Sequence, residues 1–164
     1  MRGYPGSGKT ILGRALEHAG VGQLVDHNQI LDSVAAIAGN DDGLYDAIHS
    51  LEQAITRKLL HDGKSAIVGR GFTRLDSIQP YIAIAKDLSV PCRIFRIDVP
   101  VEVLKDRVQS LLRKKGWNPT TTPEALEAWV SGHPMNPIDG ETVLDGTLPT
   151  PKLVKIITDL RARE

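Results

Sequence analysis

Hydrophobic residues along the chain recur at two different spacings. Steps of three and four residues, as in Leu44, Ile48, Leu51 and Ile55, are typical of one face of a helix. They predict helices over residues 10–19, 28–38, 44–59, 75–88, 100–115 and 122–130, with a last helix from residue 150. Short apolar runs bounded by glycine or polar residues predict strands over residues 23–25, 65–68, 93–97 and 142–144.

Strands alternate with helices, and this order predicts an α/β protein with a mostly parallel sheet covered by helices on both faces. The chain of 164 residues has the size of one compact domain, so we expect residues 1–164 to form a single domain. Pro80 either bends the helix over 75–88 or marks its true start. Proline and glycine are frequent between Gly116 and Gly140, which predicts a flap within a lid of approximately residues 105–140.

Charge and cysteine content limit the classes of partner. Twenty basic residues face twenty acidic ones, whereas proteins that rely on long-range attraction to nucleic acid or membrane usually carry a basic surplus. Cys92 is the only cysteine, which excludes an internal disulfide and fits a reducing compartment. No apolar run approaches the ~18 residues that span a bilayer, and the start lacks the apolar stretch of a signal peptide. We therefore expect a cytoplasmic protein.

The segment Gly3-Tyr4-Pro5-Gly6-Ser7-Gly8-Lys9-Thr10 matches the phosphate-binding pattern G-x-x-x-x-G-K-S/T. Its glycines permit torsions at which consecutive N–H groups turn toward one anion, and the helix beginning near Gly8 presents its unpaired N–H groups to the same phosphates. We expect Lys9 to reach the outer phosphates and the Thr10 hydroxyl to ligate magnesium. A glycine-rich turn that only connects strand to helix explains the glycines but not Lys9 and Thr10. The pattern therefore predicts binding of ATP with Mg²⁺.

Only Met1 and Arg2 precede this segment, although such a loop normally follows a buried strand. Either the chain begins further upstream, or its central strand is a stub. The loss of several buried side chains would cost about 1.5–3 kcal/mol each. We expect a first strand that is truncated or very short.

With this loop and this element order, the chain resembles the P-loop kinases that phosphorylate hydroxyl groups, and within them the polynucleotide kinase and zeta-toxin group. The likeness in element order covers nearly the whole chain, but only the phosphate loop is specific. It implies a three-layer P-loop NTPase fold of the kinase type. Such a fold has a mostly parallel sheet of about five strands, helices on both faces and a helical lid.

The resemblance assigns roles to three further residues. Asp26, at the end of the strand over 23–25, stands where these kinases carry a general base that also helps to hold magnesium. Capping of the following helix is the alternative role for Asp26. By the same resemblance, Arg107 borders the adenine and Arg113 reaches the β- and γ-phosphates. A solvated, basic helix end is the alternative for both arginines.

The strand over 65–68 runs into Gly69-Arg70-Gly71 and lacks the acid of a Walker B strand, which argues against a motor ATPase. Arg70 and Arg74 follow this strand on the loop at its carboxyl end, where open α/β sheets bind ligands. They could hold a phosphate of the acceptor. Pairing with a nearby carboxylate such as Asp76 is the alternative.

Together these features predict an ATP-dependent phosphotransferase with a hydroxyl acceptor. The favoured activity is that of a polynucleotide 5′-hydroxyl kinase, with a DNA or RNA 5′ end as partner. The alternatives are a small-molecule or nucleotide-sugar kinase, and an ATP-binding module without catalysis. No membrane contact and no obligate protein partner are expected.

Overall fold

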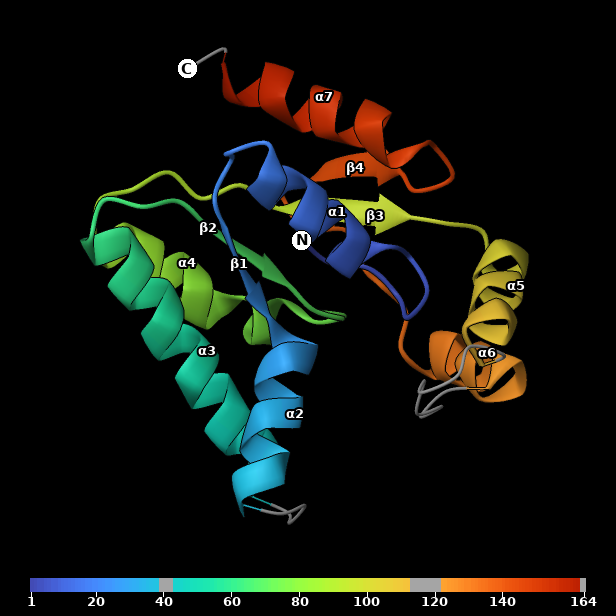
Figure 1. Ribbon diagram of the computed structural model, residues 1–164. Coiled ribbons are helices and arrows are strands. Elements are labelled where there is room, and N and C mark those ends of the chain that lie inside the picture. The colour runs from blue at the N-terminus through green and yellow to red at the C-terminus, as the bar shows by residue number, and fades with distance from the viewer. Residues whose placement is uncertain (39–42, 113–121, 163–164) are drawn as a thin grey trace.

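The computed structural model describes residues 1–38, 43–112 and 122–162, and Figure 1 shows how the helices and strands are arranged. The strands are β1 Gln23–Asp26, β2 Ala66–Gly69, β3 Phe95–Asp98 and β4 Thr142–Asp145. The helices are α1 Lys9–His18, α2 His27–Ala38, α3 Leu44–His61, α4 Gln79–Asp87, α5 Val101–Leu112, α6 Pro123–Gly132 and α7 Thr150–Arg161, with a 3-10 turn η1 Leu75–Ser77 before α4.

All strand pairings are parallel, and the first two residues of the chain join two strand pairs into one sheet. β1 pairs with β2, and β3 pairs with β4. Arg2 forms parallel bridges to Arg70 on one side and to Arg96 on the other. Its N–H donates to Phe95 O at 2.8 Å, and its carbonyl accepts from Ile97 N at 2.9 Å. The order is therefore β1, β2, stub, β3, β4, and the very short central strand that the sequence predicts is present.

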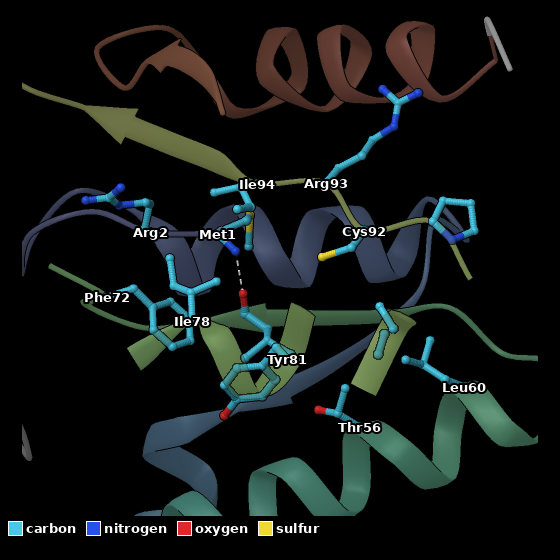
Figure 2. Close-up of a pocket in the computed structure, with 14 residues that line it drawn as sticks. Met1, Arg2, Thr56, Leu60, Phe72, Ile78, Tyr81, Cys92, Arg93 and Ile94 are labelled. Atoms are coloured by element: carbon cyan, nitrogen blue, oxygen red, sulfur yellow. Dashed lines mark hydrogen bonds between the residues drawn. The ribbon is translucent and has the colours of Figure 1, made fainter. Parts of the chain in front are cut away.

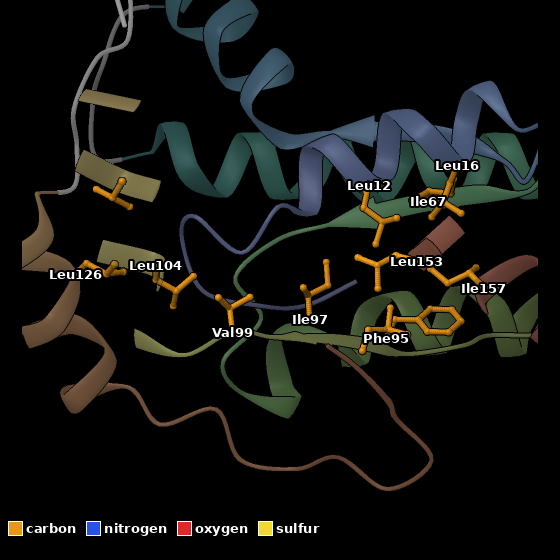
Figure 3. Close-up of a cluster of buried hydrophobic side chains, with 12 residues drawn as sticks. Leu12, Leu16, Ile67, Phe95, Ile97, Val99, Leu104, Leu126, Leu153 and Ile157 are labelled. Carbon is orange, nitrogen blue, oxygen red and sulfur yellow. The ribbon is translucent and has the colours of Figure 1, made fainter. Parts of the chain in front are cut away.

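Helices cover both faces of this sheet, as the strand alternation requires. Ile67 belongs to a buried cluster with residues of α1 and α7, which Figure 3 shows around the strands. Its neighbour Val68 points the other way and lines a cavity together with Thr56 of α3 and Tyr81 of α4. The predicted three-layer α/β fold is confirmed.

Of the two roles predicted for Pro80, the start of the helix is confirmed: η1 precedes α4, and Pro80 lies in the first turn of α4. The buried face of α3 differs from the sequence-based prediction. In α3 the buried residues are four apart, and they are Leu44, Ile48, Glu52 and Thr56. Leu51, which the apolar stripe included, is 41% exposed. The predicted apolar face of α3 is therefore rotated relative to the face that is buried in the structure. Glu52 lies on the buried face of the helix.

A cavity of about 130 Å³ lies beside the amino end of the central stub. Figure 2 shows the Met1 amino group inside it, donating to Val68 O at 2.5 Å. Burial lowers the pKa of this amino group to about 5. Ala66, which begins β2, and residues 91–94, which precede β3, also line the cavity. The cavity is therefore at the amino ends of the strands. Ligands of open α/β sheets bind at the opposite edge, at the carboxyl ends of the strands.

Among the described helices, none combines the length and the apolar character that a membrane span requires.

Candidate phosphoryl-transfer site

Two glycines give the phosphate loop its shape. Gly6 has a φ of 79° and Gly8 a φ of 96°, torsions that side chains disfavour. A Cβ on Gly6 would lie 3.3 Å from Leu104 O and from Val108 Cγ2, so the loop lies directly on α5. A Cβ on Gly8 would meet nothing within 4 Å. The loop is thus packed on one side and open on the other, as a cradle for an anion must be.

Lys9 begins α1, and its ammonium group lies within the loop. Its Nζ donates to the carbonyl oxygens of Gly3 at 2.8 Å and Tyr4 at 2.9 Å. Burial lowers the pKa of Lys9 to about 8. Neutral carbonyl groups compensate a buried charge less well than anions do, so phosphate oxygens are the better partners for this ammonium group. Thr10, the predicted magnesium ligand, follows in the first turn of α1.

Asp26 ends β1 and is only 8% exposed. Its Oδ1 accepts from Asn28 N at 3.1 Å, and its Oδ2 accepts from Arg14 Nη2 at 3.2 Å. The capping role that the sequence left open is therefore present. Asp26 also pairs across the sheet with Gly69, and a Cβ on Gly69 would lie 3.8 Å from Lys9 Cβ. The backbone of β2 that pairs with Asp26 is therefore next to Lys9 of the phosphate loop. Arg14 was not predicted as a site residue. Its position one turn after Thr10, on the same face of α1, is the sequence feature that could have indicated it.

Arg107 of α5 connects the phosphate loop to the loop after β4. Its guanidinium donates to Gly6 O at 3.3 Å and to Gly146 O at 2.8 Å. Gly146 follows β4, and a Cβ there would lie 2.4 Å from Val99 Cγ2. The loop after β4 therefore packs so closely against the end of β3 that only a glycine fits at position 146. Arg113, predicted at the β- and γ-phosphates, lies outside the described residues.

The two arginines predicted to hold an acceptor phosphate are both paired with carboxylates. Arg74 Nη2 lies 2.7 Å from Asp76 Oδ2, and these side chains are 78% and 64% exposed. This is the alternative partner that the sequence left open. Arg70 Nη1 lies 2.7 Å from Glu52 Oε2, with side-chain exposures of 14% and 0%. Arg70 thus has a different and much more buried partner than the sequence suggested.

Glu52 is the main residue that sequence reasoning missed. Besides Arg70, its carboxylate accepts from Tyr81 Oη at 3.2 Å and lies 2.7 Å from His27 Nδ1. The sequence feature that could have indicated Glu52 is its spacing of four residues from Ile48, which continues the buried face of α3. This contact with Glu52 holds His27, the residue that follows Asp26 in the chain.

Aromatic contacts tie the phosphate loop to α6. Tyr4 and Trp129 meet edge to face with ring centroids 5.8 Å apart. The Tyr4 hydroxyl donates to His133 O at 3.0 Å and accepts from Met135 N at 2.9 Å. The described part of the predicted lid thus contacts the loop directly.

A family model described as an AAA domain matches residues 1–131 of this chain. The chain belongs to this AAA domain family. No curated protein sequence matches this AAA domain. Its similarity to solved structures concerns the fold, which it shares with P-loop kinases.

Three of the similar solved structures show this likeness. A candidate kinase from Chloroflexus aurantiacus is 19% identical, with a TM-score of 0.78 over 99% of this chain and 93% of that one. An APS kinase from Mycobacterium tuberculosis in complex with AMPPNP and APS is 13% identical, with a TM-score of 0.68 over 98% and 94%. A gluconokinase from Sinorhizobium meliloti is 14% identical, with a TM-score of 0.60 over 94% and 85%.

The residues beside the loop suit magnesium better than a metal held by protein groups alone. Within residues 1–38, 43–112 and 122–162, no group of three or more His, Cys, Asp and Glu side chains could hold a metal ion. The sequence predicts only two protein ligands here, the Thr10 hydroxyl and the Asp26 carboxylate. Mg²⁺ commonly takes one or two protein oxygens and completes its shell with water and substrate phosphates.

Proposed function

We propose that this AAA domain is a kinase that transfers the γ-phosphate of ATP to a hydroxyl group of a small acceptor. One observation carries the proposal. Gly69 pairs with Asp26 across the sheet and adjoins Lys9 of the phosphate loop, because a Cβ on Gly69 would lie 3.8 Å from Lys9 Cβ. A phosphate cradle beside a single carboxylate is the arrangement that phosphoryl transfer to a hydroxyl requires.

Binding uses groups that already surround the loop. The N–H groups at the start of α1 and the Lys9 ammonium group bind the phosphates, with Lys9 exchanging its carbonyl partners for phosphate oxygens. By the resemblance, Arg107 would border the base, and Arg113, outside the described residues, would neutralise charge on the transferred group. Thr10 and Asp26 would hold Mg²⁺, which supplies further charge neutralisation when it is bound.

The transfer step needs one proton acceptor. The acceptor oxygen forms a bond to the γ-phosphorus while the bond from that phosphorus to the bridging oxygen of ADP breaks. The hydroxyl proton moves to an Asp26 carboxylate oxygen, and ADP leaves with the electron pair of the broken bond. Arg14 and Asn28 N hold Asp26 in position, so the base is oriented before the acceptor binds.

Three observations support a small acceptor. The chain has no net charge, and each arginine proposed for acceptor binding has a carboxylate partner. Two of the similar structures are also named for small-molecule kinases, an APS kinase and a gluconokinase. A polynucleotide 5′-hydroxyl end is the second candidate. It is supported by the exposure of Arg74 and Asp76, because an exposed pair contributes little and can exchange for a phosphate.

Transfer of labelled γ-phosphate to an acceptor panel tests the proposal. The panel contains polyols, sugars, sugar acids and an oligonucleotide with a free 5′-hydroxyl, each at two salt concentrations. A rate that falls steeply with salt indicates the oligonucleotide, since phosphate contacts release counterions. Binding of ATP without transfer to any acceptor would indicate a nucleotide-binding module without kinase activity.

Asp26→Asn is the decisive variant. It keeps the shape of the side chain but removes the proton acceptor, so we expect transfer to fall by about 10²–10⁴-fold. Binding of ATP should persist. Asp159→Asn on α7 is the matched control, because Asp159 is 53% exposed and pairs only with Lys155 among the described contacts. Equal transfer rates for Asp26→Asn and the unaltered protein would exclude Asp26 as the base.

A further inference from the structure

A buried carboxylate connects three segments around the acceptor side of the site. Glu52 is 0% exposed, yet it lies on α3, far from the phosphate loop in sequence. His27 from the start of α2, Arg70 from the end of β2 and Tyr81 from α4 all contact its two oxygens. A buried carboxylate with partners from three elements fixes those partners relative to one another.

The partners of Glu52 are direct neighbours of the proposed base. His27 follows Asp26 in the chain, and Arg70 follows Gly69, which pairs with Asp26 across the sheet. Both residues therefore stand at the carboxyl edge of the sheet, next to Asp26. An acceptor whose hydroxyl reaches Asp26 would lie at the same edge.

The charges at this edge are balanced. Burial raises the pKa of Glu52, but the hydrogen bond with His27 and the charge of Arg70 together bring it below its ordinary value, so Glu52 is ionised. An ionised carboxylate only accepts hydrogen bonds, so His27 donates through Nδ1. Burial and the charge of Arg70 lower the pKa of His49, which is therefore neutral at pH 7. Two carboxylates, Asp26 and Glu52, thus face the guanidinium groups of Arg14 and Arg70.

Backbone strain also accompanies the position of Arg70. Phe72, two residues on, has a φ of 44°, a left-handed torsion that is an outlier for a bulky residue. Its ring lies 5.9 Å below the Arg70 guanidinium and meets Tyr81 edge to face at 5.6 Å. Strained torsions persist where the surroundings hold them and are frequent at ligand sites. The position of Arg70 is therefore held by two independent features, the Glu52 carboxylate and the Phe72 ring.

We propose that Glu52 determines acceptor specificity: by pairing with Arg70 it cancels the charge of this buried guanidinium beside Asp26, so that the site selects an uncharged polyhydroxyl acceptor over its anionic counterpart. The proposal rests on the proposed kinase function. Glu52 acts through Arg70 and His27 and is a positioning residue.

A matched pair of acceptors tests this proposal in the whole chain. The pair is a neutral sugar and the corresponding sugar acid, such as glucose and gluconate, or the best neutral acceptor of the panel and its carboxylate form. We expect the unaltered protein to show the higher kcat/KM for the neutral member. Glu52→Gln keeps the shape of the side chain but releases the charge of Arg70. The ratio of acid to neutral kcat/KM should then rise about tenfold or more, as a new charge-assisted hydrogen bond implies.

Three controls separate this effect from a loss of folding. Glu127→Gln, at an exposed position of α6, should leave the ratio unchanged. The double variant Glu52→Gln/Arg70→Gln removes both charges and should return the ratio to that of the unaltered protein. The affinity of Glu52→Gln for ATP should stay within about twofold, because Glu52 does not contact the phosphate loop in the described structure, whereas general unfolding would lower it.

The outcomes distinguish failure of the Glu52 assignment from failure of the proposed kinase function. A ratio that Glu52→Gln leaves unchanged, or an unaltered protein that prefers the acid, overturns the assignment of Glu52. The second of these measurements needs no variant, so it decides the matter even where Glu52→Gln does not fold. Absence of transfer by the unaltered protein to every acceptor overturns the proposed function itself, and Glu52 with it.

Discussion

Removal of the Glu141 carboxylate should lower the free energy of unfolding by an amount that can be worked out from the structure. This buried carboxylate lies between two guanidinium groups. Its Oε2 accepts from Arg2 Nη1 at 3.0 Å, and its Oε1 forms an ion pair with Arg96 Nε at 3.1 Å. The side chains of Arg2, Glu141 and Arg96 are 0%, 4% and 19% exposed. The contact to Arg96 Nε lacks hydrogen-bond alignment, so attraction between charges dominates it. Glu141→Ala would leave two guanidinium groups facing each other with little access to water.

The magnitude follows from the burial. Breaking a buried ion pair by removing one partner costs about 3–5 kcal/mol, a large part of the roughly 5–15 kcal/mol that stabilise a domain. For a chain of this size, 1 kcal/mol changes Tm by about 2–4 °C, so we expect a decrease of about 6–20 °C. Arg2 directly precedes Gly3, and its Nη2 also donates to Asn136 O at 3.0 Å. Affinity for ATP should therefore decrease together with stability.

Urea and thermal unfolding followed by circular dichroism measure this effect. Glu127→Ala is the matched control, since its carboxylate is 55% exposed and pairs with Lys105 at 3.0 Å. Exposed pairs contribute about 0–1 kcal/mol, so the control should unfold almost as the unaltered protein does. A loss below about 1 kcal/mol for Glu141→Ala, on the scale of an exposed pair, would refute the reasoning that this charge is buried and indispensable.

Three further predictions concern the phosphate loop and its neighbour. Lys9→Met should weaken ATP binding by about 10–150-fold in calorimetry, because a charged hydrogen-bond donor is lost, whereas Lys86→Met on α4 should not. The pKa of Lys9 is about 8 in the free protein, and bound phosphates raise it, so binding takes up a proton above pH 8. ATP affinity should be constant from pH 7 to about 8 and then fall by up to tenfold per pH unit, and a constant affinity up to pH 9.5 would contradict this coupling. Gly146→Ala should destabilise the protein by about 1–3 kcal/mol in urea, since the new Cβ would lie 2.4 Å from Val99 Cγ2 and 2.5 Å from Ile97 Cγ2, and an unchanged urea midpoint would show that the loop has room.

Features that depend on neighbouring residues could be predicted from the sequence alone. The torsions of Gly6 and Gly8, the start of α1 at Lys9 and the place of Asp26 at a strand end all follow from residues close in the chain. The alternation of strands and helices is also local, because hydrophobic spacing reports the period of each element. These features sufficed for the fold and for the phosphate cradle.

Only the tertiary structure decided which distant residues meet. A small rotation of the apolar stripe around α3 determines whether Leu51 or Glu52 is buried, and the spacing of apolar residues does not resolve that difference. Because Glu52 is on the buried face of α3, it pairs with Arg70 and compensates its charge beside Asp26. Arg2 and Glu141 meet although 139 residues separate them, because the stub lies between β2 and β3. Side-chain charge compensation depends on packing between elements, and that packing is what local sequence patterns do not encode.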